Sequence, residues 1–132
     1  MVVVDASLLV EALAEDGHRG DAVRELLVEH GPLAAPDLID VETLSVLRRQ
    51  WLRGALTGRR LSDAVNDLGS LPLARCPVAP LMRRAYELRQ NVTPYDACYL
   101  ALAEFMECDL LTLDTRLAAA PGVSCRVVVP SL

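Results

Sequence analysis

Two short apolar runs, one near each end of the chain, each lead directly into an aspartate. Residues 2–4 precede Asp5, and residues 110–113 precede Asp114. Such short aliphatic runs predict strands that are buried on both faces. Strands of this kind belong to parallel sheets covered by helices, and ligands bind these sheets at the carboxyl ends of the strands. We therefore expect Asp5 and Asp114 to lie at the ligand-binding edge of a parallel sheet.

The rest of the chain alternates helical and strand-like patterns. Thr93 and Pro94, for example, supply an N-cap and a first helical position in front of a mainly apolar helix. Because alternating strands and helices imply a mostly parallel sheet with helices on both faces, we expect one α/β domain over residues 1–132. We predict strands over residues 2–4, 33–35, 109–113 and 126–129 and a short edge strand within 71–78, with helices over 6–15, 21–30, 36–53, 62–68, 81–89, 94–107 and 115–121.

Length, hydropathy and cysteine content favour a reducing compartment. The 132 residues are enough for one domain with its own core. No run of about 18 apolar residues occurs, so we expect no membrane-spanning helix, and the start of the chain lacks the basic residues of a signal peptide. None of the four cysteines forms a Cys-x-x-Cys pair, which favours free thiols over a zinc or redox site. We therefore expect a cytoplasmic protein.

The net charge of −5 by itself argues against a nucleic-acid partner. Divalent cations bound to a carboxylate cluster would offset most of that charge. All 13 basic residues are arginines, which bind phosphate through two parallel hydrogen bonds. We expect Arg48, Arg49 and Arg116 to contact a phosphate-bearing substrate, although solvated helix faces explain such arginines equally well. Further arginines cluster at Arg83, Arg84 and Arg89.

Two more acids accompany the two at the strand ends, and together they form the set called here the four acids: Asp5, Glu42, Asp96 and Asp114. Taken singly, each aspartate caps a predicted helix start, and Glu42 is an ordinary solvated helix residue. Taken together at one sheet edge, the four acids repel one another unless a cation neutralises them. Carboxylate oxygens suit Mg²⁺ or Mn²⁺. The sequence therefore points to a metal-dependent enzyme that acts on phosphates.

Hydroxyl groups stand two residues from two of the four acids. Ser7 follows Asp5 at this spacing, and Thr112 precedes Asp114. Each hydroxyl can orient a carboxylate or a metal-bound water. Local hydrogen bonds to the backbone are the simpler interpretation of both.

Four segments carry motifs in a fixed order. They are Val-Val-Val-Asp-Ala-Ser at residues 2–7, Ala-Pro-Asp-Leu-Ile-Asp-Val-Glu at 35–42, Tyr-Asp-Ala and Tyr-Leu-Ala-Leu-Ala within 95–103, and Leu-Thr-Leu-Asp-Thr-Arg-Leu at 111–117. In this order and spacing, over nearly the whole chain, they resemble the PIN-domain family, and specifically VapC-type toxin ribonucleases.

The resemblance implies a PIN-like three-layer α/β/α sandwich and assigns catalysis to the four acids. Of these, Asp5, Asp96 and Asp114 would hold Mg²⁺ or Mn²⁺, which activates a water to cleave RNA endonucleolytically. Glu42 would complete the cluster. The resemblance further implies a homodimer and a VapB-like antitoxin that blocks the active site, and we expect an apolar groove between the early helices to receive it.

We considered three other interpretations of the acids. A phospho-acceptor receiver domain also uses strand-end aspartates and Mg²⁺, but it needs a lysine, and the chain has none. A phosphatase with an aspartate nucleophile needs Asp-x-Asp, where this chain has Asp5-Ala6-Ser7. The alternative that survives is a catalytically silent PIN-like module that binds RNA or protein. Metal-dependent RNA cleavage that is lost on Asp96→Asn separates the nuclease from this module.

Overall fold

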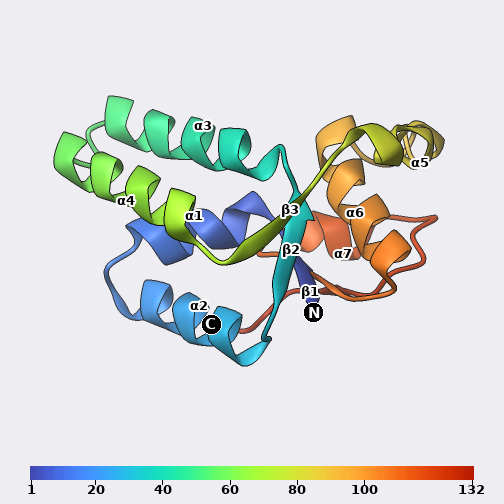
Figure 1. The fold of residues 1–132 in the computed structure, drawn as a ribbon, viewed down its shortest axis with the longest axis horizontal. Helices are drawn as coiled ribbons and strands as arrows, with labels where there is room; N and C mark the ends of the chain where they lie inside the picture. The colour runs from blue at the N-terminus through green and yellow to red at the C-terminus, as the bar shows by residue number, and fades with distance from the viewer.

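The computed structural model describes residues 1–132, and a five-stranded sheet lies at its centre (Figure 1). The strand order is β3-β2-β1-β4-β5, and every neighbouring pair is parallel. The prediction of a mostly parallel sheet is confirmed. The segment 71–78 supplies an edge strand, as expected. The strands are β1 (Val2–Val4), β2 (Leu33–Pro36), β3 (Leu73–Cys76), β4 (Leu110–Leu111) and β5 (Val127–Val128).

Helices cover both faces of the sheet, so the molecule is the expected α/β/α sandwich. In Figure 1 helices α1 to α4 lie on one side of the strands, and α5 and α6 lie on the other. Helix α6 packs on β1 and β2, and seven of its residues are buried. The helices are α1 (Ala6–Ala14), α2 (His18–Glu29), α3 (Ile39–Leu52), α4 (Gly58–Ser70), the short 3₁₀ helix η1 (Ala79–Leu81), α5 (Met82–Glu87), α6 (Pro94–Met106) and α7 (Thr115–Ala118).

Several predicted boundaries were wrong, and local residues explain the differences at α3 and α4. Helix α3 starts at Ile39 instead of residue 36, because Pro36 belongs to β2 and a turn follows it. Helix α4 starts at Gly58 instead of residue 62, because the Thr57 side chain accepts a hydrogen bond from the Arg60 N–H. Helix α2 starts three residues earlier than predicted, and β4 is shorter than predicted.

The order of the strands reverses at the centre of the sheet. From β1 the chain proceeds to β2 on one side, and it later returns to place β4 on the other side of β1. Connections that leave adjacent strands in opposite directions open a crevice at the carboxyl ends of those strands. Here the two strands are β1 and β4, which are followed by Asp5 and by the segment that contains Asp114.

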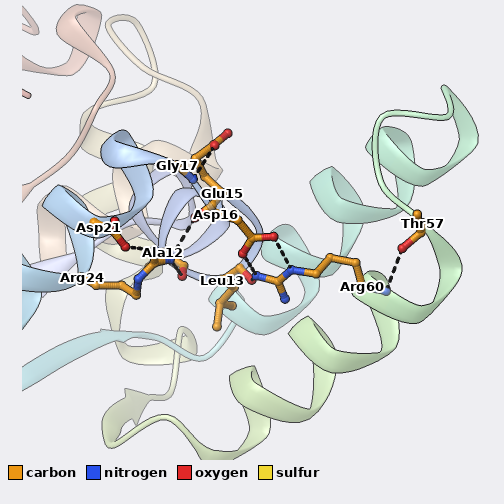
Figure 2. A network of polar contacts seen from close by, with 9 residues as sticks. All are labelled: Ala12, Leu13, Glu15, Asp16, Gly17, Asp21, Arg24, Thr57 and Arg60. Carbon is orange, nitrogen blue, oxygen red and sulfur yellow. Dashed lines mark hydrogen bonds and ion pairs between the residues drawn. The ribbon is translucent and has the colours of Figure 1, made fainter.

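Arginines fix the far end of α1, the helix that begins at this crevice (Figure 2). Arg24 of α2 donates to the carbonyl oxygens of Ala12 and Glu15 at 2.8 and 2.9 Å. Arg60 of α4 donates to the Leu13 carbonyl and pairs with Asp16. Because the last carbonyls of a helix have no partner within it, these bonds satisfy α1 and join it to its two neighbours.

None of the helices is long and apolar enough to span a membrane. All four cysteines are free thiols, as expected, and Cys98 is buried in the core. The core is built mainly from leucine, valine and alanine side chains of the strands, α1 and α6.

Candidate functional site

Asp5 is the most deeply placed of the four acids. It follows β1, caps the N-terminus of α1, and is only 7% exposed. Its Oδ1 accepts from the Ser7 N–H at 3.1 Å and from the Ser7 hydroxyl, and its Oδ2 accepts from the Thr112 hydroxyl. Burial raises the pKa of the Asp5 carboxyl, and these hydrogen bonds oppose that rise.

The two hydroxyls also join the end of β1 to the segment after β4. The Ser7 hydroxyl oxygen accepts from the Leu113 N–H, and the Thr112 oxygen accepts from the Asp114 N–H, both at 3.0 Å. The Thr112 side chain therefore orients the carboxylate of Asp5, which is 107 positions away in sequence. Its hydrogen bond with Asp114 involves the backbone N–H of Asp114 and leaves the Asp114 carboxylate free of Thr112. A fully buried hydroxyl with both partners satisfied makes the position of Asp5 rigid.

Glu42 lies in the first turn of α3 and is half-buried. The buried Tyr99 of α6 donates its hydroxyl to Glu42 Oε1 at 2.8 Å. Burial raises the pKa of Glu42, the Tyr99 hydrogen bond opposes this, and the charges of Asp96 and Asp5 raise it further. Glu42 therefore lies within electrostatic reach of two of the other acids.

Asp96 and Asp114 form the outer part of the group. Asp96 is in the first turn of α6, where its pKa is raised by burial and then by the charge of Asp114. Asp114 caps α7 and receives two hydrogen bonds from the Arg116 guanidinium, at 3.2 and 3.0 Å, which lower its pKa. The Arg116 side chain is 88% exposed, so this ion pair contributes little stability and is easily exchanged.

The structure thus brings the four acids into one electrostatic group around the crevice. Three of them have raised pKa values, and burial is the largest cause of the rise in each. The donor set consists of carboxylate oxygens with no lysine nearby, so its chemistry fits a hard divalent cation.

The spacing of the group limits how a cation would be held. No three histidine, cysteine, aspartate or glutamate side chains converge closely enough to coordinate one ion directly. Mg²⁺ commonly keeps several waters and takes only one or two carboxylates from the protein, so the four acids fit this ion if some of them act through water.

An open pocket of about 510 Å³ adjoins the outer acids. Asp96 and Asp114 line it together with Asn91, Arg89 and Arg116. Of the three arginines predicted to contact substrate, Arg116 therefore reaches the pocket.

The other two predicted substrate arginines, Arg48 and Arg49, do not line this pocket. Both are exposed on the carboxyl-terminal half of α3. In Figure 1 this half of the helix extends away from α6.

Three further acids near the strand ends lie outside this group. Asp40 pairs with Arg75 at 2.7 Å, and Asp109 pairs with Arg126. Asp37 is exposed. None of the three belongs to the pocket beside Asp96 and Asp114.

Sequence reasoning missed Tyr99. It lies three residues after Asp96 on α6, a spacing that puts two side chains on the same helix face. That spacing was available from the sequence as a signal. The pairing with Glu42 was not, because Glu42 lies on a helix 57 positions earlier in the chain.

Comparison with known proteins identifies the family and agrees with the fold. Residues 2–123 match the model of the PIN domain. Ribonuclease VapC1 of Mycobacterium tuberculosis is 42% identical over 126 residues, which cover 95% of this chain and 94% of that protein. The crystal structure of VapC20 from Mycobacterium tuberculosis, described as a sarcin-ricin loop cleaving toxin, superposes with a TM-score of 0.73 at 19% identity and covers 98% of this chain and 100% of that one. A toxin–antitoxin complex from Klebsiella pneumoniae has a TM-score of 0.66 at 20% identity, covering 99% of this chain and 98% of that one.

Proposed function

Because the chain belongs to the PIN-domain family, and within it to the VapC ribonucleases, we propose that it is a metal-dependent endoribonuclease and the toxin of a toxin–antitoxin pair. The observation that carries the proposal is the electrostatic grouping of the four acids at the crevice between β1 and β4. Raised carboxyl pKa values at such a crevice are a mark of functional sites. All four acids belong to this proposed active site.

A bound Mg²⁺ or Mn²⁺ would supply a nucleophilic water near neutral pH and would offset charge on the phosphate oxygens. Asp5, Asp96 and Asp114 are the residues that would hold it. The hydrogen bonds from the Ser7 and Thr112 hydroxyls favour the ionised form of Asp5 and fix the direction of its carboxylate. Glu42 accepts from Tyr99 through one oxygen, which leaves the other to orient the attacking water. Attack on phosphorus, with departure of the 3′-oxygen, leaves a 5′-phosphate and a 3′-hydroxyl.

The direct test is RNA cleavage by the purified chain in Mg²⁺, Mn²⁺ or EDTA, with Asp96→Asn beside the wild type. We expect cutting that requires the metal and is lost in the variant. Asp37→Asn is the matched control, because it removes the same charge from an exposed residue outside the pocket. Cutting that persists in EDTA would contradict the metal mechanism.

The alternative is a PIN-like module that binds RNA or protein without cutting it. The observation that favours it is the absence of three directly converging ligands. A folded wild type that binds RNA and cuts none of several RNA classes in either metal would select this alternative.

Tyr99→Phe should weaken cleavage without abolishing it. The change removes the only O–H donor that the structure gives to Glu42, a charge-assisted hydrogen bond. We expect kcat/KM to fall by about tenfold and the free energy of unfolding to fall by about 1 kcal/mol. Tyr95→Phe is the control, because Tyr95 is 63% exposed on the same helix. Equal kcat/KM in the two variants would remove Tyr99 from the site.

The same proposal includes partners and compartment. An apolar cavity of about 450 Å³ lies between α1, α2 and the end of α4, where it suits an amphipathic helix of an antitoxin. The fold shared with the Klebsiella pneumoniae toxin–antitoxin complex supports this partner. A small protein encoded beside this chain should co-purify with it and suppress cutting; failure of both would contradict the pairing. We further propose a homodimer that acts in the cytoplasm, with Arg48, Arg49 and Arg116 contacting RNA phosphates.

A further inference from the structure

Two arginines lie close to an exposed aromatic ring at α5. Tyr86 is 54% exposed, and the guanidinium carbon of Arg89 lies 4.1 Å from the centroid of its ring. The corresponding distance for Arg83 is 5.5 Å. The Arg89 guanidinium also donates to the Tyr86 carbonyl at 3.0 Å, so its plane is held on the ring. We call Arg83, Tyr86 and Arg89 the α5 platform.

The two arginines of the α5 platform carry charges that the protein does not neutralise. Arg84, which lies between them in sequence, pairs with Glu87 and Glu104 and so occupies the local acids. Neither Arg83 nor Arg89 forms an ion pair with a carboxylate in the structure. In a chain with a net charge of −5, an unpaired positive pair on an aromatic ring is a local site for an anion.

Arg89 connects the α5 platform to the two outer acids. Arg89 lines the same 510 Å³ pocket as Asp96 and Asp114. The wall between them is fixed, because the Asn91 side chain donates to the Pro121 carbonyl at 3.0 Å. A nucleotide whose phosphate lies at the acids would therefore place its neighbour near the platform.

We propose that the α5 platform stacks an unpaired base of the RNA, next to the phosphate that the four acids cleave. Bases stack on aromatic rings and on guanidinium planes, and arginines contact the adjoining phosphates. A base within a duplex has both faces covered by its neighbours, so the platform selects single-stranded RNA. This inference rests on the proposed ribonuclease function and names the form of RNA that the site accepts.

The test combines kinetics and binding on full-length variants. Arg89→Ala and Tyr86→Leu should each raise KM for a single-stranded RNA by about tenfold, with kcat changed less than about twofold. Arg89→Lys, which keeps the charge and loses the plane, should recover only part of the loss. Tyr86→Trp, which keeps an aromatic ring at this position, should keep the KM of the wild type. Arg59→Ala is the matched control, because Arg59 is exposed on α4 and also lacks a carboxylate partner.

A measurement of RNA binding without cleavage distinguishes an error about the α5 platform from an error about the ribonuclease function. A short fluorescein-labelled RNA of mixed sequence, single-stranded or annealed to its complement, is titrated in EDTA and followed by anisotropy. Wild type should bind the single strand more tightly than the duplex, and Arg89→Ala should lose this preference. If wild type cuts RNA but Arg89→Ala and Arg59→Ala match it in KM and in binding, the platform is wrong. If wild type cuts nothing, the ribonuclease proposal fails, and binding alone decides the platform.

Discussion

Asp5→Asn should abolish RNA cleavage while leaving the fold intact. The variant keeps the shape of the side chain and removes the charge that a cation would bind, so we expect cleavage to fall by roughly 10²–10³-fold. Asp5 is the most buried of the four acids and directly follows β1. Cleavage at the wild-type rate would remove Asp5 from the active site.

The same variant should lack the pH dependence that the Asp5 carboxyl gives to stability when no metal is present. Burial raises the folded-state pKa of Asp5 above its ordinary value of 3.8, so the ionised form destabilises the folded state. This destabilisation is present above the raised pKa and disappears as the pH falls below 3.8. In EDTA the melting temperature of the wild type should therefore rise relative to that of Asp5→Asn as the pH falls from 7 to below 3.8. A difference in melting temperature that does not change with pH would contradict the electrostatic account.

Glu104→Gln should cause the largest loss of stability among single charge changes. Glu104 is 10% exposed and accepts from Arg84 at 2.8 and 3.0 Å and from the Ser124 N–H and hydroxyl at 2.8 and 2.7 Å. These bonds join α5, α6 and the segment before β5. The Arg84 guanidinium, with help from Ser124, lowers the pKa of Glu104 to about 2.

A lowered folded-state pKa stabilises the fold above the unfolded value of 4.5, and this stabilisation is lost as the pH falls from 4.5 toward 2. The Arg84 side chain is 35% exposed, so solvent weakens its attraction to Glu104. We therefore expect Glu104→Gln to lower the free energy of unfolding by about 2 kcal/mol at pH 7. The melting temperature should fall by about 5–10 °C. The gap to wild type should narrow at pH 3. Glu25→Gln, exposed on α2, is the control; a gap that is independent of pH would contradict the ion-pair explanation.

The architecture was predictable because local sequence patterns indicate most of its strands and helices. The apolar run before Asp5 and the capping residues before α6 each fixed an element, and the alternation of elements implied a parallel sheet. The start of α4 was missed because Thr57 stands between two glycines that read as helix breakers. The Thr57 side chain accepts a hydrogen bond from the Arg60 N–H, and this cap sets the start of α4.

The candidate site was predictable in its acids and only partly in their surroundings. Asp5 and Asp114 follow from strand ends, which sequence patterns reveal. That Thr112 orients Asp5, and that Tyr99 holds Glu42, depends on contacts between distant segments. The α5 platform was equally hidden, because three residues spaced over one helix and its turn read as an ordinary solvated surface.

The measurement that tests the central claim most directly is Mn²⁺ binding to the purified chain, followed by calorimetry and by the melting temperature. Wild type should bind Mn²⁺ and become more stable with it, since a ligand of the folded state stabilises that state. Asp5→Asn and Asp96→Asn should lose both responses, while Asp37→Asn keeps them. A folded wild type that binds no Mn²⁺ and still cuts RNA in EDTA would contradict the claim that the four acids form a metal-dependent active site.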